Sequence, residues 1–274
     1  MESVKLAQQF WKDGFVIVRS LFSSKEILEF RRAALDRTNR RADLLSSPEL
    51  RNAILNPRVL SVFRELLGSD DLVYFSDSST SIGPTDAGFH KDNVDKSDPN
   101  GPDWRGRYPI VRMGIYTEDH SRHPEGLDLR RGSHNIVSSK DGQHVQADTR
   151  LGDVVFWNLR TSHSGGAMKF LGRPVNPESV AGKVLRRLPM LRDKHTGERV
   201  ALFATIGARG EHLDRFVSYL KTRCYAVEGW NASVYDEHAL QAAEAAGIEI
   251  RNMRVEIANE PPRIVNRGHV PLPY

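Results

Sequence analysis

The feature that most constrains the fold is a series of short strand patterns that begins at residue 72 and is punctuated by turn residues. Apolar and β-branched runs alternate with segments rich in Gly, Pro, Asp and Asn. This spacing is typical of a sandwich or barrel, because parallel strands need crossover connections of about a dozen or more residues, usually helices. The six expected strands cover residues 72–75, 111–116, 127–130, 143–147, 154–157 and 200–206.

Helical patterns precede the strand series. Residues 3–13 predict a short helix, and the β-branched run at 14–18 predicts a strand directly after it. Ser23 and Glu26 have the spacing of a capping box, in which each side chain bonds to the backbone amide of the other residue. We therefore expect a second helix to begin at Ser23.

Further helical patterns lie on both sides of the strand series. Residues 48–67 form one such region, which Pro57 should divide and Gly68 should end. Helices are expected again only after residue 210, near 211–222 and 236–246. The picture is a β core with helices outside it.

Length and composition are those of an ordinary globular protein. The chain has 274 residues, of which 39% are hydrophobic and 27% charged. No segment approaches the ~20 apolar residues of a spanning helix, and the N-terminus lacks a signal-peptide pattern, so we expect a cytoplasmic protein without a membrane partner. We expect one domain over residues 1–274, with a helical support at about 1–70, a β core at about 72–206 and C-terminal helices at about 211–246.

Cysteine and charge restrict the chemistry. Cys224 is the only cysteine, which excludes an internal disulfide and a thiolate metal site, so a metal would be held by nitrogen and oxygen. The net charge is +4, but residues 160–223 contain thirteen Lys or Arg against five Asp or Glu, a local net of +8. Such a segment attracts an anionic small molecule or nucleic acid, or is simply a solvated face. No aromatic-rich nucleic-acid signature accompanies it.

The tripeptide His90-Lys91-Asp92 supplies two candidate metal ligands. Residues two apart on an extended strand point to the same side, so His90 and Asp92 can reach one ion. His163 lies just past the buried-strand pattern at 153–157, where a strand end would present a third ligand into a barrel mouth. Two imidazoles and one carboxylate with open positions opposite suit non-haem ferrous iron in oxygen-activating enzymes. The other histidines considered are less suited to this role: His120, His123, His134, His144 and His195.

Two long excursions interrupt the strand series, at 93–107 and 171–198. Loops of this length without secondary structure are often lids or binding loops. Trp104, among polar residues and glycine and proline in the first excursion, is a candidate substrate contact. The alternative is a lid residue packed on the domain.

Four blocks of the sequence occur in a recognisable order. They are Phe10 to Val18 with Leu21-Phe22-Ser23, Phe89-His90-Lys91-Asp92, Arg112 to Asp119 with Gly126 to His134, and Gly152 to His163. Together they resemble the phytanoyl-CoA dioxygenase family of Fe(II)- and 2-oxoglutarate-dependent oxygenases. The resemblance covers most of the chain and implies a double-stranded β-helix, a jelly-roll barrel with flanking helices. It also implies Fe(II) held by His90, Asp92 and His163, with 2-oxoglutarate and O2 as cosubstrates.

The same resemblance implies an arginine that binds the distal carboxylate of 2-oxoglutarate. Arg199 opens a clear strand pattern and is favoured, with Leu171 to Glu198 interpreted as an insertion. Arg173 is the runner-up, because it stands ten residues after His163. Arg131, where the family usually has proline, is a departure from the pattern.

The implied activity is oxidation of a small-molecule substrate, with release of succinate and CO2. The carboxylate of Asp92 favours hydroxylation or a related oxidation over halogenation, since halogenating relatives lack it. The basic segment suggests an anionic or carrier-linked substrate. The alternative is a jelly-roll protein without redox chemistry, such as an epimerase, or a protein that binds a small molecule or nucleic acid. The oligomeric state stays open.

Overall fold

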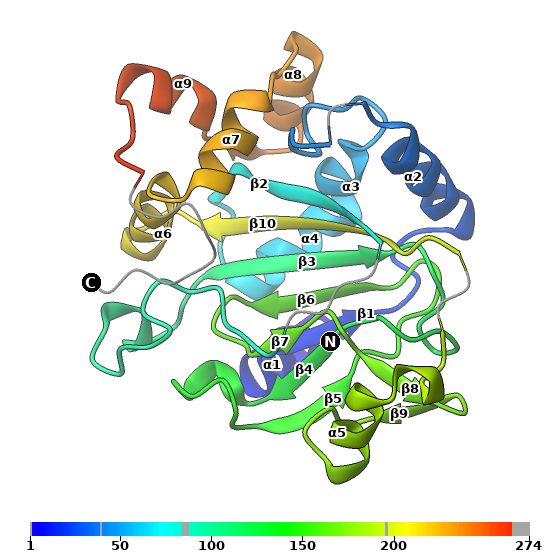
Figure 1. Cartoon of the computed structure of the whole chain (residues 1–274). Coiled ribbons are helices and arrows are strands. Elements are labelled where there is room, and N and C mark those ends of the chain that lie inside the picture. The colour runs from blue at the N-terminus through cyan, green and yellow to red at the C-terminus, as the bar shows by residue number, and fades with distance from the viewer. Residues whose placement is uncertain (1, 39, 84–87, 195–196, 265–274) are drawn as a thin grey trace.

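A six-stranded sheet forms the centre of the computed structural model, which describes residues 2–38, 40–83, 88–194 and 197–264 (Figure 1). Its strand order is β1-β6-β3-β10-β2-β11, and all neighbours are antiparallel except β11, which is parallel to β2. The last long strand in the sequence therefore lies between the first and second long strands. The bounds are β1 Phe15–Val18, β2 Leu72–Ile82, β3 Ile110–Tyr116, β6 Val154–Asn158, β10 Val200–Ala208 and β11 Ile248–Ile250.

A smaller sheet with the order β5-β4-β7 faces the large one. Apolar side chains of both sheets share one core, including Tyr116 and Trp157 from the large sheet and Leu129 from the small sheet. A backbone bridge between His90 and His163 adds one more extended segment beside β7. The bounds are β4 Asp128–Arg131, β5 Gln143–Gln146 and β7 His163–Ser164, and a separate hairpin consists of β8 Met168–Phe170 and β9 Arg173–Val175.

A group of helices covers the other face of the large sheet. Along β3, Val111, Met113 and Ile115 belong to the core shared with these helices. Because strand side chains alternate, Arg112 on the same strand points to the opposite face, toward the small sheet. The group comprises α1 Glu2–Asp13, α2 Ser24–Asp36, α3 Asn52–Leu55, α4 Pro57–Leu67 and α8 Glu237–Ala245.

A second group of helices packs on the same face as the small sheet. It comprises α6 Glu211–Lys221, α7 Cys224–Ala232 and α9 Met253–Asn259. Their core includes Val73 and Phe75 of β2 and Ile110 of β3, which alternate with the residues that face the first group.

Most of the expected elements are confirmed. Each of the six expected strands is present within a few residues, and β2 extends further than predicted. The Ser23 hydroxyl accepts a hydrogen bond from the Glu26 amide at 3.2 Å, and the Glu26 carboxylate accepts one from the Ser23 amide at 2.7 Å. Gly68 ends α4 in the left-handed conformation with φ of 64°.

The prediction that residues 171–198 lack secondary structure is wrong, and so is the expectation that helices return only after residue 210. This excursion contains β9, the helix α5 (Val180–Arg187) and a 3-10 turn at Pro189–Leu191. The hydroxyl of Ser179 caps α5 by accepting from the Gly182 amide at 3.0 Å. Helices α7 and α9 were also not predicted, so the fold is a mixture of helices and antiparallel sheets rather than mostly β. In the described part of the chain, no helix is long and apolar enough to cross a membrane.

Candidate metal centre

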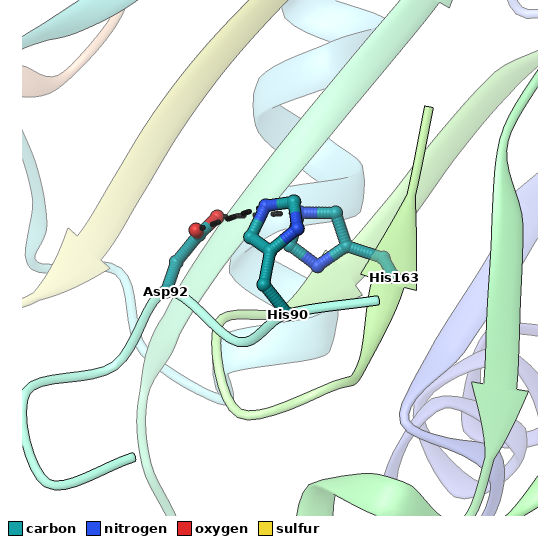
Figure 2. Close-up of side chains that lie close together, drawn as sticks. All are labelled: His90, Asp92 and His163. Atoms are coloured by element: carbon teal, nitrogen blue, oxygen red, sulfur yellow. Dashed lines mark ion pairs between the residues drawn. The ribbon is translucent and has the colours of Figure 1, made fainter. Parts of the chain in front are cut away.

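His90, Asp92 and His163 converge, as the sequence predicted (Figure 2). One ligand atom from each residue lies within 4.8 Å of the other two. The Nε2 atom of His90 is 3.6 Å from Oδ1 of Asp92, and Nε2 of His163 is 3.4 Å from Oδ2 of Asp92. The three side chains therefore present two nitrogens and a carboxylate to one point, the donor set that suits ferrous iron.

Backbone hydrogen bonds hold the three candidate ligands together. The amide of His90 donates to the His163 carbonyl at 3.0 Å, and the amide of His163 donates back at 2.9 Å. The Asp92 amide donates to the Leu159 carbonyl at 3.0 Å. Two segments with 72 residues between His90 and His163 are thus joined at the candidate ligands themselves.

Lys91 points away from the ligands, as expected for the residue between two that share a side. Its side chain is buried, and its ammonium donates to the carbonyls of Ser133 and Arg160, both at 2.6 Å. Burial, together with nearby Arg160 and Arg130, lowers the pKa of Lys91 to about 7. The residue fastens the ligand segment to the two loops behind it.

The second nitrogen of each imidazole fixes the ring. Nδ1 of His90 lies 2.9 Å from the Gly88 carbonyl, and Nδ1 of His163 lies 3.0 Å from the Thr161 carbonyl. A carbonyl oxygen can only accept, so each Nδ1 carries the proton in these bonds. Nε2 is then the atom with a free lone pair, which is the form a metal requires.

The charge states also suit metal binding. Burial lowers the pKa of His163 to about 4, so this imidazole is neutral at neutral pH. Burial alone would raise the pKa of Asp92, but Arg112, His163 and His90 outweigh it and hold that pKa far below its usual range. Neutral imidazole and ionised carboxylate are the states from which no proton must leave before a metal binds.

Arg112 is a site residue that sequence reasoning missed. Its guanidinium donates to Asp92 Oδ2 and Asp77 Oδ2, both at 2.8 Å, and to the Thr205 hydroxyl at 2.9 Å. Burial lowers the pKa of Arg112, but Asp77 and Asp92 raise it above its ordinary value. The available signal was a charged residue at an inward position of the apolar run 110–116.

A cavity of about 750 Å³ lies beside the ligands. Strand β2, the segment around His90 and Asp92, and the helices α6 and α7 contribute its walls. Trp104, the candidate substrate contact, is not among the described residues that line it. Its indole N–H donates to the Asp95 carbonyl at 2.8 Å, and its ring faces Lys91 and Arg160, so it packs on its own loop and its neighbours.

The two candidate arginines occupy different environments. Arg199 is only 2% exposed and precedes β10, with its guanidinium donating to the Glu125 carbonyl at 2.7 Å and to the Ser81 hydroxyl at 3.1 Å. It lies 5.6 Å from the centre of the Tyr116 ring, inside the core between the sheets. Arg173 is exposed on the β8–β9 hairpin.

The five other histidines considered from the sequence have other partners or positions. A ring nitrogen of His120 lies near the Pro124 carbonyl, and one of His134 lies near the Trp11 carbonyl. A ring nitrogen of His144 lies near the Asp128 carboxylate. His123 is half-buried in the turn before Pro124, and His195 lies outside the described residues. The basic segment 160–223 is divided as well: Arg223 lines the cavity, whereas the lysine and arginines of α5 are exposed.

Comparison with solved structures shows the fold. The iron-bound HygX from Streptomyces hygroscopicus matches with a TM-score of 0.54 and 18% identity, over 74% of this chain and 86% of that one. The epimerase SnoN from nogalamycin biosynthesis, in complex with Fe3+, alpha ketoglutarate and nogalamycin RO, matches with a TM-score of 0.51 and 17% identity, over 76% and 84%. AviO1 from Streptomyces viridochromogenes Tue57 matches with a TM-score of 0.52 and 14% identity, over 76% and 96%.

Comparisons by sequence add nothing to this. No family model matches the chain, and no curated protein matches it. The likeness to HygX, SnoN and AviO1 therefore concerns the architecture.

Proposed function

We propose that this chain is an Fe(II)- and 2-oxoglutarate-dependent oxygenase of the phytanoyl-CoA dioxygenase type, which oxidises a small-molecule substrate and releases succinate and CO2. The observation that carries the proposal is the convergence of His90, Asp92 and His163 between two facing sheets. The strand order supports assigning a double-stranded β-helix, because β10 inserts between β2 and β3 while β7 pairs with β4 and with His90. HygX and SnoN, whose folds match, are described with iron or nickel and 2-oxoglutarate.

The residues fit the metal. Both imidazoles present Nε2 because their Nδ1 atoms donate to backbone carbonyls, and the carboxylate is ionised. His90, Asp92 and His163 would hold the ion, and Arg112 would keep the Asp92 carboxylate oriented toward it. When bound, ferrous iron with 2-oxoglutarate and O2 supplies the oxidising power that the side chains themselves lack.

The remaining tasks belong to the chain. Arg199 is the proposed anchor for the distal carboxylate of 2-oxoglutarate, because a buried guanidinium recognises a carboxylate with strong charge-assisted bonds. Trp157 lies against His163 with ring centres 5.4 Å apart, and its indole N–H is buried with no hydrogen-bond partner among the described residues. A polar cosubstrate in this space would satisfy such a group. Arg173 remains the alternative anchor.

The test is an anaerobic titration of the protein with Fe(II) and then with 2-oxoglutarate, monitored by visible absorbance. We expect a weak charge-transfer band that requires both additions and is abolished by His163→Ala. His123→Ala removes a half-buried histidine outside the triad and should leave the band unchanged. A band of equal strength in the His163 variant, or no band in the unsubstituted protein, would overturn the proposal.

The affinity for 2-oxoglutarate distinguishes Arg199 from Arg173 as the proposed anchor. Arg199→Lys should weaken it at least tenfold, because a lysine cannot reproduce a bidentate contact, whereas Arg173→Lys should leave it unchanged. The reverse order would assign the anchor to Arg173.

The outcome of oxidation is the second part of the proposal. We propose hydroxylation, because the carboxylate of Asp92 occupies the position that halide needs in halogenating relatives. SnoN, with the same fold, is named an epimerase, so product identity needs its own measurement. Substrate-dependent succinate release across a metabolite panel, with product masses raised by one oxygen atom, supports hydroxylation. An unchanged mass would indicate epimerisation, and a loss of two hydrogens would indicate desaturation or ring closure.

A further inference from the structure

The outward face of α5 carries two lines of exposed side chains that the metal centre does not use. Three apolar residues at a spacing of four lie along α5 and its C-terminal cap, and three basic residues lie in a second line beside them. The apolar line is Val180, Val184 and Leu188, and the basic line is Lys183, Arg186 and Arg187. Val180 is 81% exposed and Val184 45%. No residue of α5 is among the described residues that line the cavity beside His90, so this face lies outside the candidate active site.

The opposite face of α5 holds the helix against the rest of the protein. Leu185 is buried, and a Cβ on Gly182 would lie 2.1 Å from the Asn176 carbonyl oxygen, so the helix packs closely on the segment before it. The Glu178 carboxylate, just before the helix, pairs with Arg130 of β4. The helix is therefore fixed, and burial of its outward apolar side chains requires another molecule.

The apolar surface extends beyond the helix. The Asp193 carboxylate accepts hydrogen bonds from the Leu171 amide at 3.0 Å and the Gly172 amide at 2.7 Å, which ties the turn of the β8–β9 hairpin to the segment after α5. Exposed apolar side chains occur on both of these joined segments: Leu171, Met190 and Leu191. Single exposed apolar residues are normal, but a cluster of them marks an interaction surface.

The basic line has no counter-charge of its own. Over the described part of the chain, none of its three side chains forms an ion pair or a hydrogen bond. The acidic residues on either side of the helix are engaged elsewhere, Glu178 with Arg130 and Asp193 with two backbone amides. Charges beside an apolar contact decide which partner is accepted, because opposite charges attract and like charges repel. A partner that covers α5 should therefore be acidic.

We propose that α5 binds an acidic amphipathic helix of a partner protein, whose apolar side chains pack on the apolar line and whose carboxylates pair with the basic line. A helix suits this surface because its own side chains repeat every three to four residues, as the two lines do. A nucleic acid would match the basic line alone and leave the apolar line in water. Membrane-surface helices insert large side chains such as Trp, Phe and Leu, whereas the most exposed apolar residue of α5 is a valine. The proposal does not depend on the proposed function, because the surface lies outside the cavity.

The test measures fluorescence anisotropy of a labelled amphipathic helical peptide built from leucine, alanine and glutamate, and of its analogue with lysine at every glutamate. We expect the whole chain to bind the glutamate peptide at least tenfold more tightly than the lysine peptide. Arg186→Glu combined with Arg187→Glu should reverse this preference, which mere loss of structure would not do. Val180→Ser combined with Val184→Ser should weaken the glutamate peptide at least tenfold, because its leucines lose their contact.

The matched control is Arg254→Glu combined with Val255→Ser, which changes an exposed basic and an exposed apolar residue of α9, far from α5 in Figure 1. It should leave both affinities unchanged. Equal affinity for the two peptides, or an unchanged preference in the charge-reversed variant, would overturn the proposal.

Three other occupants are tested in parallel. If phosphatidylserine vesicles or duplex DNA bind and the glutamate peptide does not, and if the charge reversal abolishes that binding, the face recognises a membrane or a nucleic acid and the proposal is wrong. Sedimentation that shows self-association, lost in the variant with serine at residues 180 and 184, would assign the face to a second copy of the chain and would also overturn it.

Discussion

At the scale of single residues, the candidate centre depends on side chains that do not contact the metal. Lys91 and Arg112 both orient the ligand segment, one from behind and one from the side. Buried cations of this kind are costly to place and are retained where their hydrogen bonds fix a geometry. Their removal should therefore affect metal affinity as well as stability.

Lys91→Met should lower both the metal affinity and the stability of the fold. Methionine fills a similar volume but leaves the carbonyls of Ser133 and Arg160 without their buried donor. We expect the free energy of unfolding to fall by about 1.5–3 kcal/mol, the range for hydrogen bonds to a charged group. Nickel affinity, measured by calorimetry, should fall by about 10-fold or more, as for other residues that support metal ligands. Lys140→Met, at an exposed position nearby, should change neither; wild-type affinity in the Lys91 variant would refute this role.

The pKa of His163 predicts a pH dependence for the metal-free protein. In the folded state this pKa is about 4, against an ordinary value of 6.5, so the fold favours the neutral ring. The stabilisation is complete above pH 6.5 and is lost as the pH falls toward 4, because the unfolded chain then binds the proton more readily. The shift corresponds to about 3 kcal/mol. Urea unfolding at pH 7 and pH 4.5 measures this loss of unfolding free energy, and His163→Gln should lose less between the two pH values. Equal losses in the variant and the unsubstituted protein would show that His163 is not the group responsible.

At the scale of elements, the sequence predicted what is repetitive and local. Alternating and β-branched runs predicted the strands, and Ser23 with Glu26 predicted the start of α2. The helix α5 escaped because prolines and a glycine surround or interrupt it, and its cap at Ser179 was not recognised. Contacts between distant residues could not be predicted this way: Arg112 is visible as a charge in an apolar strand, but its partners Asp77 and Asp92 depend on how the sheets face each other.

The convergence of the candidate triad was predictable for a related reason. His90 and Asp92 share a side of an extended segment whatever the surrounding fold, and His163 follows a strand that must be buried. The cavity wall from α6 and α7 was not predictable, because helix docking is decided by tertiary packing rather than by the pattern within each helix.

Gly152, at the turn that starts β6, is a position where the fold requires glycine. Its φ is +97°, and a Cβ there would lie 2.2 Å from the Phe22 carbonyl oxygen, at the turn that starts β6. We expect Gly152→Ala to cost at least about 3 kcal/mol in the free energy of unfolding, since backbone strain and a clash with backbone combine. Gly68→Ala at the end of α4 shares a positive φ but meets nothing within 4 Å, so it should cost only about 1 kcal/mol. If chemical denaturation gave similar losses of unfolding free energy for the two variants, the clash at residue 152 would be relieved by a small shift of the backbone.

At the scale of the whole molecule, a bound metal links two distant parts of the chain. Because His90 and His163 are already paired through their backbones, binding requires little rearrangement. Nickel at about 100 times its dissociation constant should raise the free energy of unfolding by about 2.7 kcal/mol. Thermal unfolding with and without nickel measures this, and His163→Ala should lose most of the increase. A full increase in that variant would place the metal elsewhere.

The central position of β10 has a consequence for synthesis. Strands β2 and β3 are its neighbours on either side, and both leave the ribosome more than 80 residues earlier. Until Ala208 has emerged, each of them exposes an unpaired edge, the kind of surface from which chains aggregate. The helices that wall the cavity follow β10 in the chain. A nascent chain therefore acquires His90, Asp92 and His163 before it can complete the large sheet or wall the cavity, and chaperone dependence should be greatest over that interval.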